Sequence, residues 1–469
     1  MSRLPRSPLV LLASLGALLI MPASAEADHG TRPQTENIHA KGHSPHVSSF
    51  LGLADGARHI NSDLAFWGRT AFHGNYDGFR IIDISDPDNP SELHHQRCNG
   101  DQGDLVVWDN ILVRAWNSKK NTPRLCDGEV VPAQWEGVHV FDIGNLSDPD
   151  LVASVELPCG SHTLTVGGVS AGNLIVYSNN SSSAGCGTTT DQATQDELGD
   201  FMDVIAVPLG NLQGASLLRR EPLAGPATAI RTGCHDAGVI LGDENKLACA
   251  SADLINVFDI GENETPGGTL EDPALLFTIS EPGVGQAGTN GRWHSTTFTW
   301  DGEVIAAGWE PGGGAEPECE ATDPVVDKSM FLYDADTGTK LGQWVLPASQ
   351  SADENCTIHN YNTVPLRSGR DVVVGGHYQA GTWVVDISDP ANPATVAWSD
   401  PPPLGTVTNP AGAVVNEIGG AWSTYYYNNF VYESEITKGL NVFRVSDSVM
   451  AGPVRLAHLN PQTQDFTIG

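Results

Sequence analysis

Four histidines begin short apolar segments of similar design. They are His162 in GSHTLTV, His235 in GCHDAGV, His294 in RWHSTTF and His359 in TIHNYNTV. Neutral imidazole is a ligand for transition metals, and packing gives no reason for several histidines to converge on one point. If the fold brings these four together, we expect a divalent or transition metal site for Zn, Cu, Mn or Fe. Two alternatives remain open: each histidine hydrogen-bonds a neighbouring strand without a metal, or they line a pocket for an anionic or sugar-like ligand.

The elements that must position these histidines are repeated strands. The stretch GFRIIDISDPDNP at residues 78–90 returns almost unchanged as GTWVVDISDPANP at residues 381–393. Weaker copies begin at Gly137, Leu254, Ser329 and Gly439, and a loose one begins at Met202. Each copy is a β-branched and aromatic run that ends in an Asp, Pro, Gly or Asn turn, which is typical of a strand followed by a tight turn.

The copies recur about every 60 residues, which is longer than most propeller repeats, and Gly- and Ser-rich insertions explain the excess. Long amphipathic helical patterns are absent. Seven strand-rich repeats without a helical layer predict an all-β fold, a seven-bladed β-propeller over residues 59–460. A β-solenoid or a pair of β-sandwiches is the alternative.

In a propeller the innermost strand of each blade lines the central channel, so equivalent positions lie at one level around it. In the other three blades the position of the four histidines is assigned to Asp63, Asp104 and Trp422. Trp422 either stacks on a ligand or packs between blades. Asp236 follows His235 directly, so in a regular strand it points to the opposite face and orients a neighbour.

Three further residues lie at strand ends beside glycine-rich turns, and they are the weak candidates for catalysis: Glu310, His377 and Glu433. A carboxylate there can act as a general base or as a metal ligand, and it can equally be a solvated loop charge. No GxSxG, HExxH or P-loop motif is present, so nothing supports a serine hydrolase, a zincin or an NTPase.

The even number of cysteines predicts disulfides in an exported chain. Pairing in sequence order gives Cys98–Cys126, Cys159–Cys186, Cys234–Cys249 and Cys319–Cys356. Each closure would contribute roughly 3 kcal/mol by restricting the unfolded chain. Other connectivities and a free nucleophilic cysteine remain open.

Several stretches resemble the LVIVD-repeat family of secreted bacterial β-propeller proteins. They are GFRIIDISDP, GTWVVDISDP, GCHDAGV, WHSTTFTWDG, CTIHNYNTVP and GGAWSTYYYNNFVYESEITKGLNVF. The resemblance spans residues 60–445 and implies the propeller fold, but it implies no settled activity.

The N-terminal residues predict export. Residues 1–25 have two arginines, an apolar run and small residues ending in Ala-Ser-Ala, which is the layout of a secretory signal peptide. Residues 26–58 hold four histidines without a strand pattern and are predicted to be a flexible segment, and residues 461–469 a C-terminal tail. The protein is therefore predicted to be secreted or periplasmic, without membrane insertion and monomeric. The net charge of −33 opposes binding to nucleic acid.

Two functions fit these observations. One is a propeller that binds a metal ion through channel-facing histidines and, if it is an enzyme, acts as a metal-dependent lyase or oxidase. The other is a non-catalytic module that binds a protein or glycan partner at the channel mouth, where a small molecule is the third kind of ligand to consider. The sequence leaves open whether the protein is an enzyme.

Overall fold

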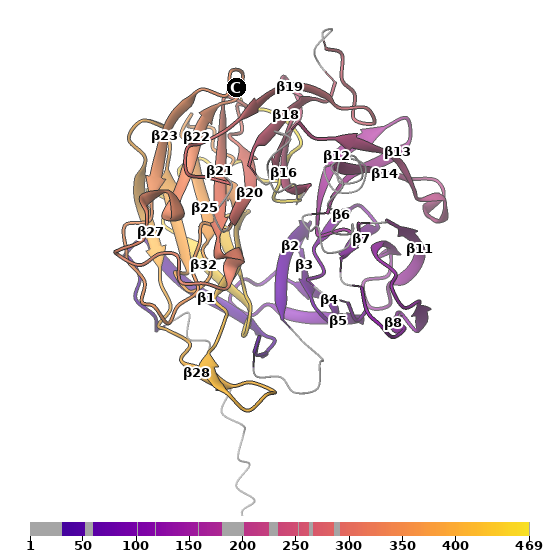
Figure 1. The fold of residues 1–469 in the computed structure, drawn as a ribbon, viewed down its shortest axis with the longest axis horizontal. Coiled ribbons are helices and arrows are strands. Elements are labelled where there is room, and N and C mark those ends of the chain that lie inside the picture. The colour runs from indigo at the N-terminus through magenta and orange to yellow at the C-terminus, as the bar shows by residue number, and fades with distance from the viewer. Residues whose placement is uncertain are drawn as a thin grey trace, which may run out of the picture.

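The repeats fold into antiparallel sheets that surround a common centre (Figure 1). The computed structural model describes residues 31–51, 60–100, 102–117, 119–157, 159–180, 201–224, 233–251, 253–261, 266–285 and 291–468. The predicted signal peptide, residues 1–25, lies outside these ranges. Successive strands of a repeat pair with one another, except that the last repeat takes its outermost strand from the N-terminal segment; this is the architecture of a β-propeller.

The strands of the described residues divide into seven four-stranded units, each named from its innermost strand outward. The first three are β2 (Asn61–Trp67), β3 (Thr70–Asn75), β4 (Gly78–Asp83) and β5 (Ser91–Arg97); β6 (Leu105–Trp108), β7 (Ile111–Trp116), β10 (Gly137–Asp142) and β11 (Asp150–Glu156); and β12 (Thr163–Ser170), β13 (Asn173–Asn179), β14 (Phe201–Pro208) and β15 (Ser216–Pro222). The fourth and fifth are β16 (Cys234–Ile240), β17 (Lys246–Ser251), β18 (Ile255–Asp259) and β19 (Ala274–Ile279); and β20 (Gly291–Phe298), β21 (Val304–Pro311), β22 (Ser329–Asp334) and β23 (Lys340–Val345). The last two are β24 (Asn360–Thr363), β25 (Val372–Gly376), β26 (Thr382–Asp386) and β27 (Ala394–Ser399); and β30 (Ala421–Tyr427), β31 (Phe430–Glu435), β32 (Gly439–Val445) and β1 (Ile38–Pro45).

The remaining elements are small. Two short two-stranded sheets lie outside the seven units. They are β8 (Arg124–Cys126) with β9 (Glu129–Val131) and β28 (Thr406–Thr408) with β29 (Val414–Asn416). Three 3-10 turns are η2 (Leu212–Gly214), η3 (Gly312–Gly314) and η4 (Val325–Lys328). No helix within the described ranges is long and apolar enough to cross a membrane.

The repeated motif is the third strand of each unit and the turn after it. The carboxylates of Asp83, Asp142 and Asp386 each accept a hydrogen bond from the backbone N–H two residues on, at 2.8, 2.9 and 3.0 Å. This Asx-type bond stabilises the turn that leads to the outermost strand. The aspartate of the motif therefore has a structural role in this turn.

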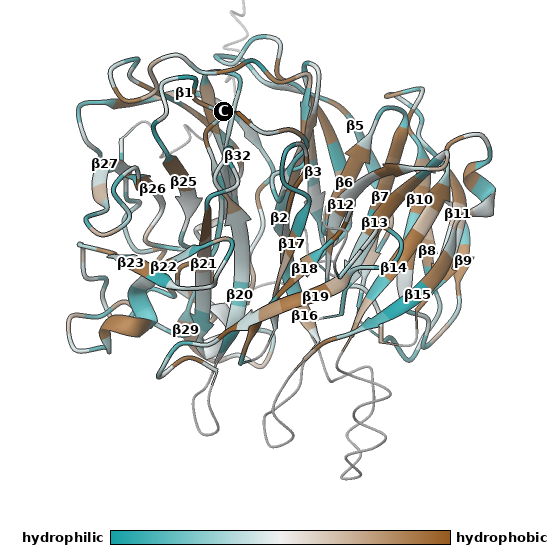
Figure 2. Cartoon of the chain, turned by 90° about the horizontal axis from the view of Figure 1, so that it is seen from above, coloured by the Kyte–Doolittle hydropathy of each residue, from teal (hydrophilic) through white to brown (hydrophobic). Residues whose placement is uncertain are grey.

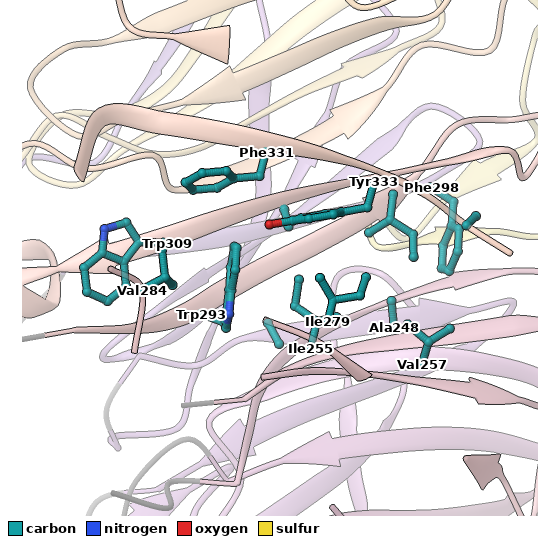
Figure 3. Packing of buried hydrophobic residues seen from close by; sticks show 14 of the residues in the cluster. Ala248, Ile255, Val257, Ile279, Val284, Trp293, Phe298, Trp309, Phe331 and Tyr333 are labelled. Atoms are coloured by element: carbon teal, nitrogen blue, oxygen red, sulfur yellow. The ribbon is translucent and has the colours of Figure 1, made fainter. Parts of the chain in front are cut away.

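The core lies between neighbouring sheets. Figure 3 shows the contact of the fourth and fifth units, where Trp293 and Phe331 meet the aliphatic side chains of Ile255 and Val257. The Trp293 and Phe331 rings are 5.4 Å apart in edge-on geometry. Hydrophobic residues are concentrated on strands such as β10 and β11, whereas β15 is mostly hydrophilic (Figure 2). Each sheet thus buries both faces against its neighbours. This packing fixes the positions of the innermost strands around the channel.

The N-terminal segment closes the ring, so the prediction of a flexible segment over residues 26–58 is wrong for Ile38–Pro45. These residues form β1, which pairs antiparallel with β32 as the outermost strand of the seventh unit. The alternation of burial along β1 is carried mostly by polar and small residues, which conceals the strand pattern in the sequence. The edge of β32 needs a partner for its backbone groups, and β1 supplies it.

The predicted C-terminal tail, residues 461–469, and the residues just before it pair with inner strands of the propeller as far as the structure describes them. Strand β33 (His458–Leu459) pairs with β2, and β34 (Thr463–Gln464) pairs in parallel with β16. The Asn460 side chain both donates to and accepts from the backbone of Val107. The tail therefore contacts the innermost strands of the first, second and fourth units.

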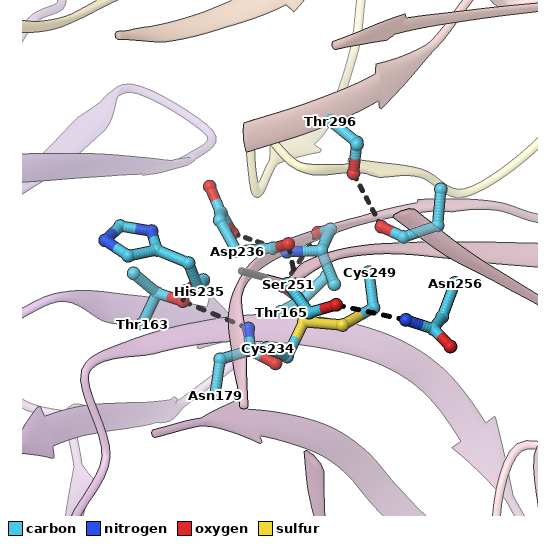
Figure 4. Close-up of a disulfide and its surroundings, with 12 residues drawn as sticks. Thr163, Thr165, Asn179, Cys234, His235, Asp236, Cys249, Ser251, Asn256 and Thr296 are labelled. Atoms are coloured by element: carbon cyan, nitrogen blue, oxygen red, sulfur yellow. Dashed lines mark hydrogen bonds between the residues drawn. A yellow bond between two sulfur atoms is a disulfide. The ribbon is translucent and has the colours of Figure 1, made fainter. Parts of the chain in front are cut away.

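Three predicted disulfides are confirmed: Cys98–Cys126, Cys234–Cys249 and Cys319–Cys356. Cys159 is disulfide-bonded as well, and its predicted partner Cys186 lies outside the described residues. The bond between Cys234 and Cys249 joins β16 to β17 beside His235 (Figure 4). No free cysteine is found in the described part of the chain.

His139 in β10 gives the fold an acid-sensitive group away from the channel. It is 1 % exposed, and burial, followed by the charge of Arg114, lowers its pKa to about 3. The unfolded chain takes up a proton below its ordinary pKa of about 6.5 and the folded chain does not, so stability is lost as pH falls below that value. The free energy of unfolding of His139→Gln relative to wild type should therefore rise by roughly 3 kcal/mol from pH 7 to pH 4. Urea titrations at both pH values measure this difference, and parallel pH curves for the two proteins would contradict it.

Candidate metal centre

A β-bulge near the start of several innermost strands turns one extra residue toward the channel. The register shifts between Cys234 and Asp236 in β16 and between Trp293 and Ser295 in β20. The residues inserted at these two places are His235 and His294, and the same irregularity in β30 inserts Trp422. Bulges are a common means of re-aiming a side chain at a site, because two residues then oppose one on the neighbouring strand.

The four predicted histidines meet at one cavity of about 120 Å³ in the channel. Their rings form a continuous row, with centroid distances of 4.6 Å from His162 to His235, 3.9 Å from His235 to His294 and 4.2 Å from His294 to His359. Trp422 lines the same cavity, with its ring 5.3 Å from that of His359. The predicted convergence is therefore present in the structure.

Glu310, one of the three weak catalytic candidates, completes this group. Its Oε1 lies 3.7 Å from Nε2 of His294 and 3.8 Å from Nε2 of His359. One ligand atom from each of His235, His294 and Glu310 lies within 4.8 Å of the others. Two ligand atoms that each bind a tetrahedral ion at about 2.1 Å are roughly 3.4 Å apart, so a small inward shift would seat an ion here.

The glycine-rich turn after β21 makes room for Glu310. The Tyr378 hydroxyl donates a 2.9 Å hydrogen bond to Glu310 Oε1, and Gly314 packs against both groups. A Cβ at Gly314 would lie 2.3 Å from the Tyr378 oxygen and 2.7 Å from Glu310 Oε1, and its φ of +75° also favours glycine. The turn thus presents the carboxylate to the histidines.

Backbone carbonyls set the proton position on two of the histidines. Nδ1 of His235 lies 3.1 Å from the carbonyl oxygen of His294, and Nδ1 of His359 is hydrogen-bonded to the carbonyl of Trp422. A carbonyl only accepts, so Nδ1 carries the proton and the Nε2 lone pair is available as a ligand. Nδ1 of His294 is buried and has no hydrogen-bond partner among the described residues.

His162 differs from the other three. The amide nitrogen of Asn117 lies 2.7 Å from its Nδ1 and donates to it, which places the imidazole proton on Nε2. In this arrangement His162 lines the cavity as a hydrogen-bond donor. The structure therefore places His162 beside the group of possible ligands without making it one of them.

Burial keeps the imidazoles neutral. It lowers the pKa of His235 and of His294 well below the ordinary value, and it lowers the pKa of His162 and of His359 to about 3. Neutral imidazoles at pH 7 leave their lone pairs free for a metal. Burial also raises the pKa of Glu310, while Arg292 and the Tyr378 hydrogen bond oppose that shift.

The other two catalytic candidates do not reach the cavity. His377 stands behind His359, where its Nδ1 accepts from the backbone N–H of His359 at 3.2 Å. Glu433 forms a buried ion pair with Arg32 at 2.6 Å and accepts hydrogen bonds from Thr382 and Asn441. The contacts of His377 and Glu433 are therefore structural.

The structure corrects the alignment of Asp63 and Asp104 with the histidines. Asp63, Asp104 and Asp236 each lie one residue after the position that the histidines occupy in the inner strands. The equivalent of His235 in the first unit is Ser62, in the cavity lining, and Asp63 corresponds to Asp236. Asp236 interacts with Asp63 and with Gln462, so it also faces the channel. This differs from the prediction for a regular strand, because the bulge changes the alternation of side chains along β16. Burial raises the pKa of Asp63, and burial together with Asp63 raises the pKa of Asp104 and of Asp236 well above the ordinary value.

Sequence reasoning did not find Arg292 and Tyr378, which also line the cavity. The Arg292 Nε lies 4.0 Å from Glu310 Oε2. Arg292 sits two residues before His294, and Tyr378 directly follows His377. Their closeness in sequence to the predicted histidines was the only feature that could have identified them as cavity residues.

Fold and site together define a β-propeller with a histidine-lined cavity at its centre. The LVIVD repeat family model matches residues 71–95 and 367–398, so the resemblance to LVIVD-repeat proteins is confirmed. The two matched segments contain the third strands β4 and β26 with the turns that follow them. A search of curated protein sequences gave no match.

Several solved structures are similar in fold at low sequence identity. The β-propeller domain of Cps50 (Swd1) from Myceliophteria thermophila is 9 % identical, covers 86 % of this chain and 100 % of its own, and has a TM-score of 0.47. The WD40 β-propeller domain of Doa1 is 13 % identical over 87 % of this chain and 100 % of its own, with a TM-score of 0.43. A protein from Lactobacillus plantarum is 13 % identical over 82 % of this chain and 97 % of its own, with a TM-score of 0.45. No function is transferred from them, and the fold rests on the strand pairing.

Proposed function

We propose that this β-propeller binds a divalent transition metal ion in its central cavity through His235, His294, His359 and Glu310. The observation that carries the proposal is the pair of Nε2–Oε1 distances, 3.7 and 3.8 Å, that join His294 and His359 to one carboxylate oxygen. Imidazoles with one carboxylate suit Zn²⁺, Mn²⁺ or Fe²⁺. Carbonyl-bound Nδ1 atoms are the usual outer support of metal-binding histidines.

The same cavity leaves space for a small ligand beside the ion. A volume of about 120 Å³ admits a few water molecules or a small anion, and the Arg292 guanidinium in its lining offers donors for it. Such an ion supplies Lewis-acid chemistry, by polarising an oxygen of whatever small molecule binds there. A glycan chain or a protein loop is larger than this cavity, so we favour the metal site as the function of the cavity itself.

We also propose that the protein works outside the cytosol. The confirmed disulfides are typical of an oxidising compartment, and the first 25 residues have the layout of a secretory signal.

Metal binding can be tested on untagged protein. The chain is stripped with a chelator, dialysed against Zn²⁺, Mn²⁺ or Fe²⁺ in separate experiments, and the bound metal is measured by mass spectrometry. We expect about one ion per chain for at least one of these metals, with a rise in the unfolding temperature that depends on metal concentration. Protein that takes up none of the three would end the proposal.

A further inference from the structure

The central cavity has two unlike walls. One wall is polar and holds the four histidines, Glu310 and Arg292. The other, the apolar wall, is made by cavity residues that also contact one another in a small hydrophobic cluster: Phe50, Tyr76, Tyr378, Trp422 and Ile436. A cavity with one polar and one apolar wall fits a molecule that has both kinds of surface.

Hydrogen bonds and ring contacts hold the apolar wall in place. Trp422 is 9 % exposed, and the rings of Phe50 and Tyr76 meet edge to face at 6.3 Å. The Glu417 carboxylate accepts from the backbone N–H of Phe50 at 2.9 Å and from that of Ile418, a further cavity residue, at 3.2 Å. The wall is therefore formed before any ligand arrives, which lowers the entropic cost of binding.

Arg292 places a positive charge at the mouth of the cavity. Its side chain is 29 % exposed, and a Cβ at the exposed cavity residue Gly313 would lie 3.8 Å from its Nη2. Its Nε is 4.0 Å from Glu310 Oε2, an ion-pair distance that is longer than a hydrogen bond. The guanidinium has five N–H donors in a planar fork, which matches the two oxygens of a carboxylate.

The charges of the lining favour an anion. Arg292 together with a bound divalent ion outweighs the single charge of Glu310. Burial and the charge of Asp63 raise the pKa of Asp104 in the same lining, which favours its neutral form. His162 adds a donor, because its Nδ1 accepts from Asn117 and its proton is therefore on Nε2.

The volume limits the size of the ligand. An apolar cavity of about 150 Å³ holds one benzene molecule. The cavity here has about 120 Å³ and must also hold the charged group. The apolar part of the ligand therefore has roughly three or four carbons.

We propose that the cavity binds a short aliphatic monocarboxylate, with its carboxylate at Arg292 beside the ion and its carbon chain against Trp422 and the rest of the apolar wall. An inorganic anion would leave the apolar wall uncovered, and a neutral molecule of the same size would leave the positive charge without a partner. The inference rests on the proposed metal function for the ion beside the carboxylate, whereas Arg292 and the apolar wall can be tested without the ion.

The test compares three probes on full-length protein, in metal-free and Zn²⁺-loaded forms whose metal content is measured by mass spectrometry. Ligand-observed NMR titrations give the dissociation constants of isobutyrate, isobutyramide and acetate. Isobutyrate should bind at least about tenfold tighter than isobutyramide, which has the same shape without the charge. It should also bind roughly tenfold tighter than acetate, because it buries two more carbons.

Two variants assign the preferences to the two walls. Arg292→Gln should reduce the preference for isobutyrate over isobutyramide at least about threefold while Zn²⁺ stays bound. Trp422→Ala should weaken isobutyrate binding at least about threefold and leave acetate binding within about twofold. Arg444→Gln, a matched control whose arginine pairs with Asp447 and does not line the cavity, should behave as wild type does. If Trp422→Ala does not fold, the comparison of isobutyrate with acetate on wild type decides the role of the apolar wall.

Failure of this inference is distinguishable from failure of the metal site. Zn²⁺-loaded protein that binds isobutyrate no tighter than isobutyramide or acetate would overturn the inference and leave the metal site standing. Protein that takes up no metal but still prefers isobutyrate would end the proposed metal function and keep the acid site. Equal preferences in wild type and Arg292→Gln would show that the acid binds elsewhere, which would overturn the inference as well.

Discussion

Replacing His294 with alanine is expected to lower the affinity for Zn²⁺ at least about 100-fold. Its imidazole lies between those of His235 and His359 and is 3.7 Å from Glu310, so its loss removes the central ligand. Even outer-shell changes at metal sites cost about 10–100-fold, and a direct ligand should cost more. Competition with a chromogenic chelator at pH 7.5 measures the change.

Two further variants make this prediction specific. Glu310→Gln keeps an oxygen that accepts from Tyr378 but removes the charge, so it should also weaken Zn²⁺ binding at least about tenfold. His94→Ala, in the outer strand β5, is the matched control and should bind as wild type does. Equal affinities for wild type and His294→Ala would show that the ion binds elsewhere.

Replacing Arg32 with alanine is expected to cost about 3–5 kcal/mol of the free energy of unfolding. The side chains of Arg32 and Glu433 are 1 % and 0 % exposed, so the variant leaves the Glu433 carboxylate buried without its counter-charge. Arg32 also precedes β1, and its loss loosens the strand that closes the ring. Urea denaturation at pH 7 measures the cost.

A double variant separates the ion pair from other effects of the substitution. Arg32→Met combined with Glu433→Gln removes both charges and keeps the volume, so it should be less destabilised than Arg32→Ala alone. Both proteins should retain Zn²⁺ binding in the folded state, since neither residue reaches the cavity. A cost below about 1 kcal/mol for Arg32→Ala would contradict a closing role for this ion pair.

Much of the fold could be predicted from sequence, because each repeat has the same pattern of apolar and turn-forming residues. The alternating strand and the aspartate turn in GFRIIDISDP and GTWVVDISDP recur at near-regular intervals, and the structure confirms the propeller and three disulfides. The ring-closing strand was missed because β1 has a polar sequence whose burial comes from β32. The sequence also showed no sign of what the tail pairs with, since Thr463 and Gln464 pair with a strand more than 200 residues away.

The candidate site was partly predictable. The common position of the histidines placed His162, His235, His294 and His359 around one cavity. Strict strand alternation failed at Asp236, because a β-bulge is a tertiary feature without a clear sequence signal. Glu433 and Glu310 looked alike in sequence, and only their partners, Arg32 in one case and two imidazoles in the other, separate a structural charge from a candidate ligand.

Anomalous diffraction from crystals of the Zn²⁺-loaded protein tests the central claim most directly. The predicted result is one strong peak in the central cavity, about 2.0–2.2 Å from Nε2 of His235 and His294 and from a carboxylate oxygen of Glu310. A cavity without a peak in fully loaded protein, or a single peak bound to surface carboxylates, would contradict it.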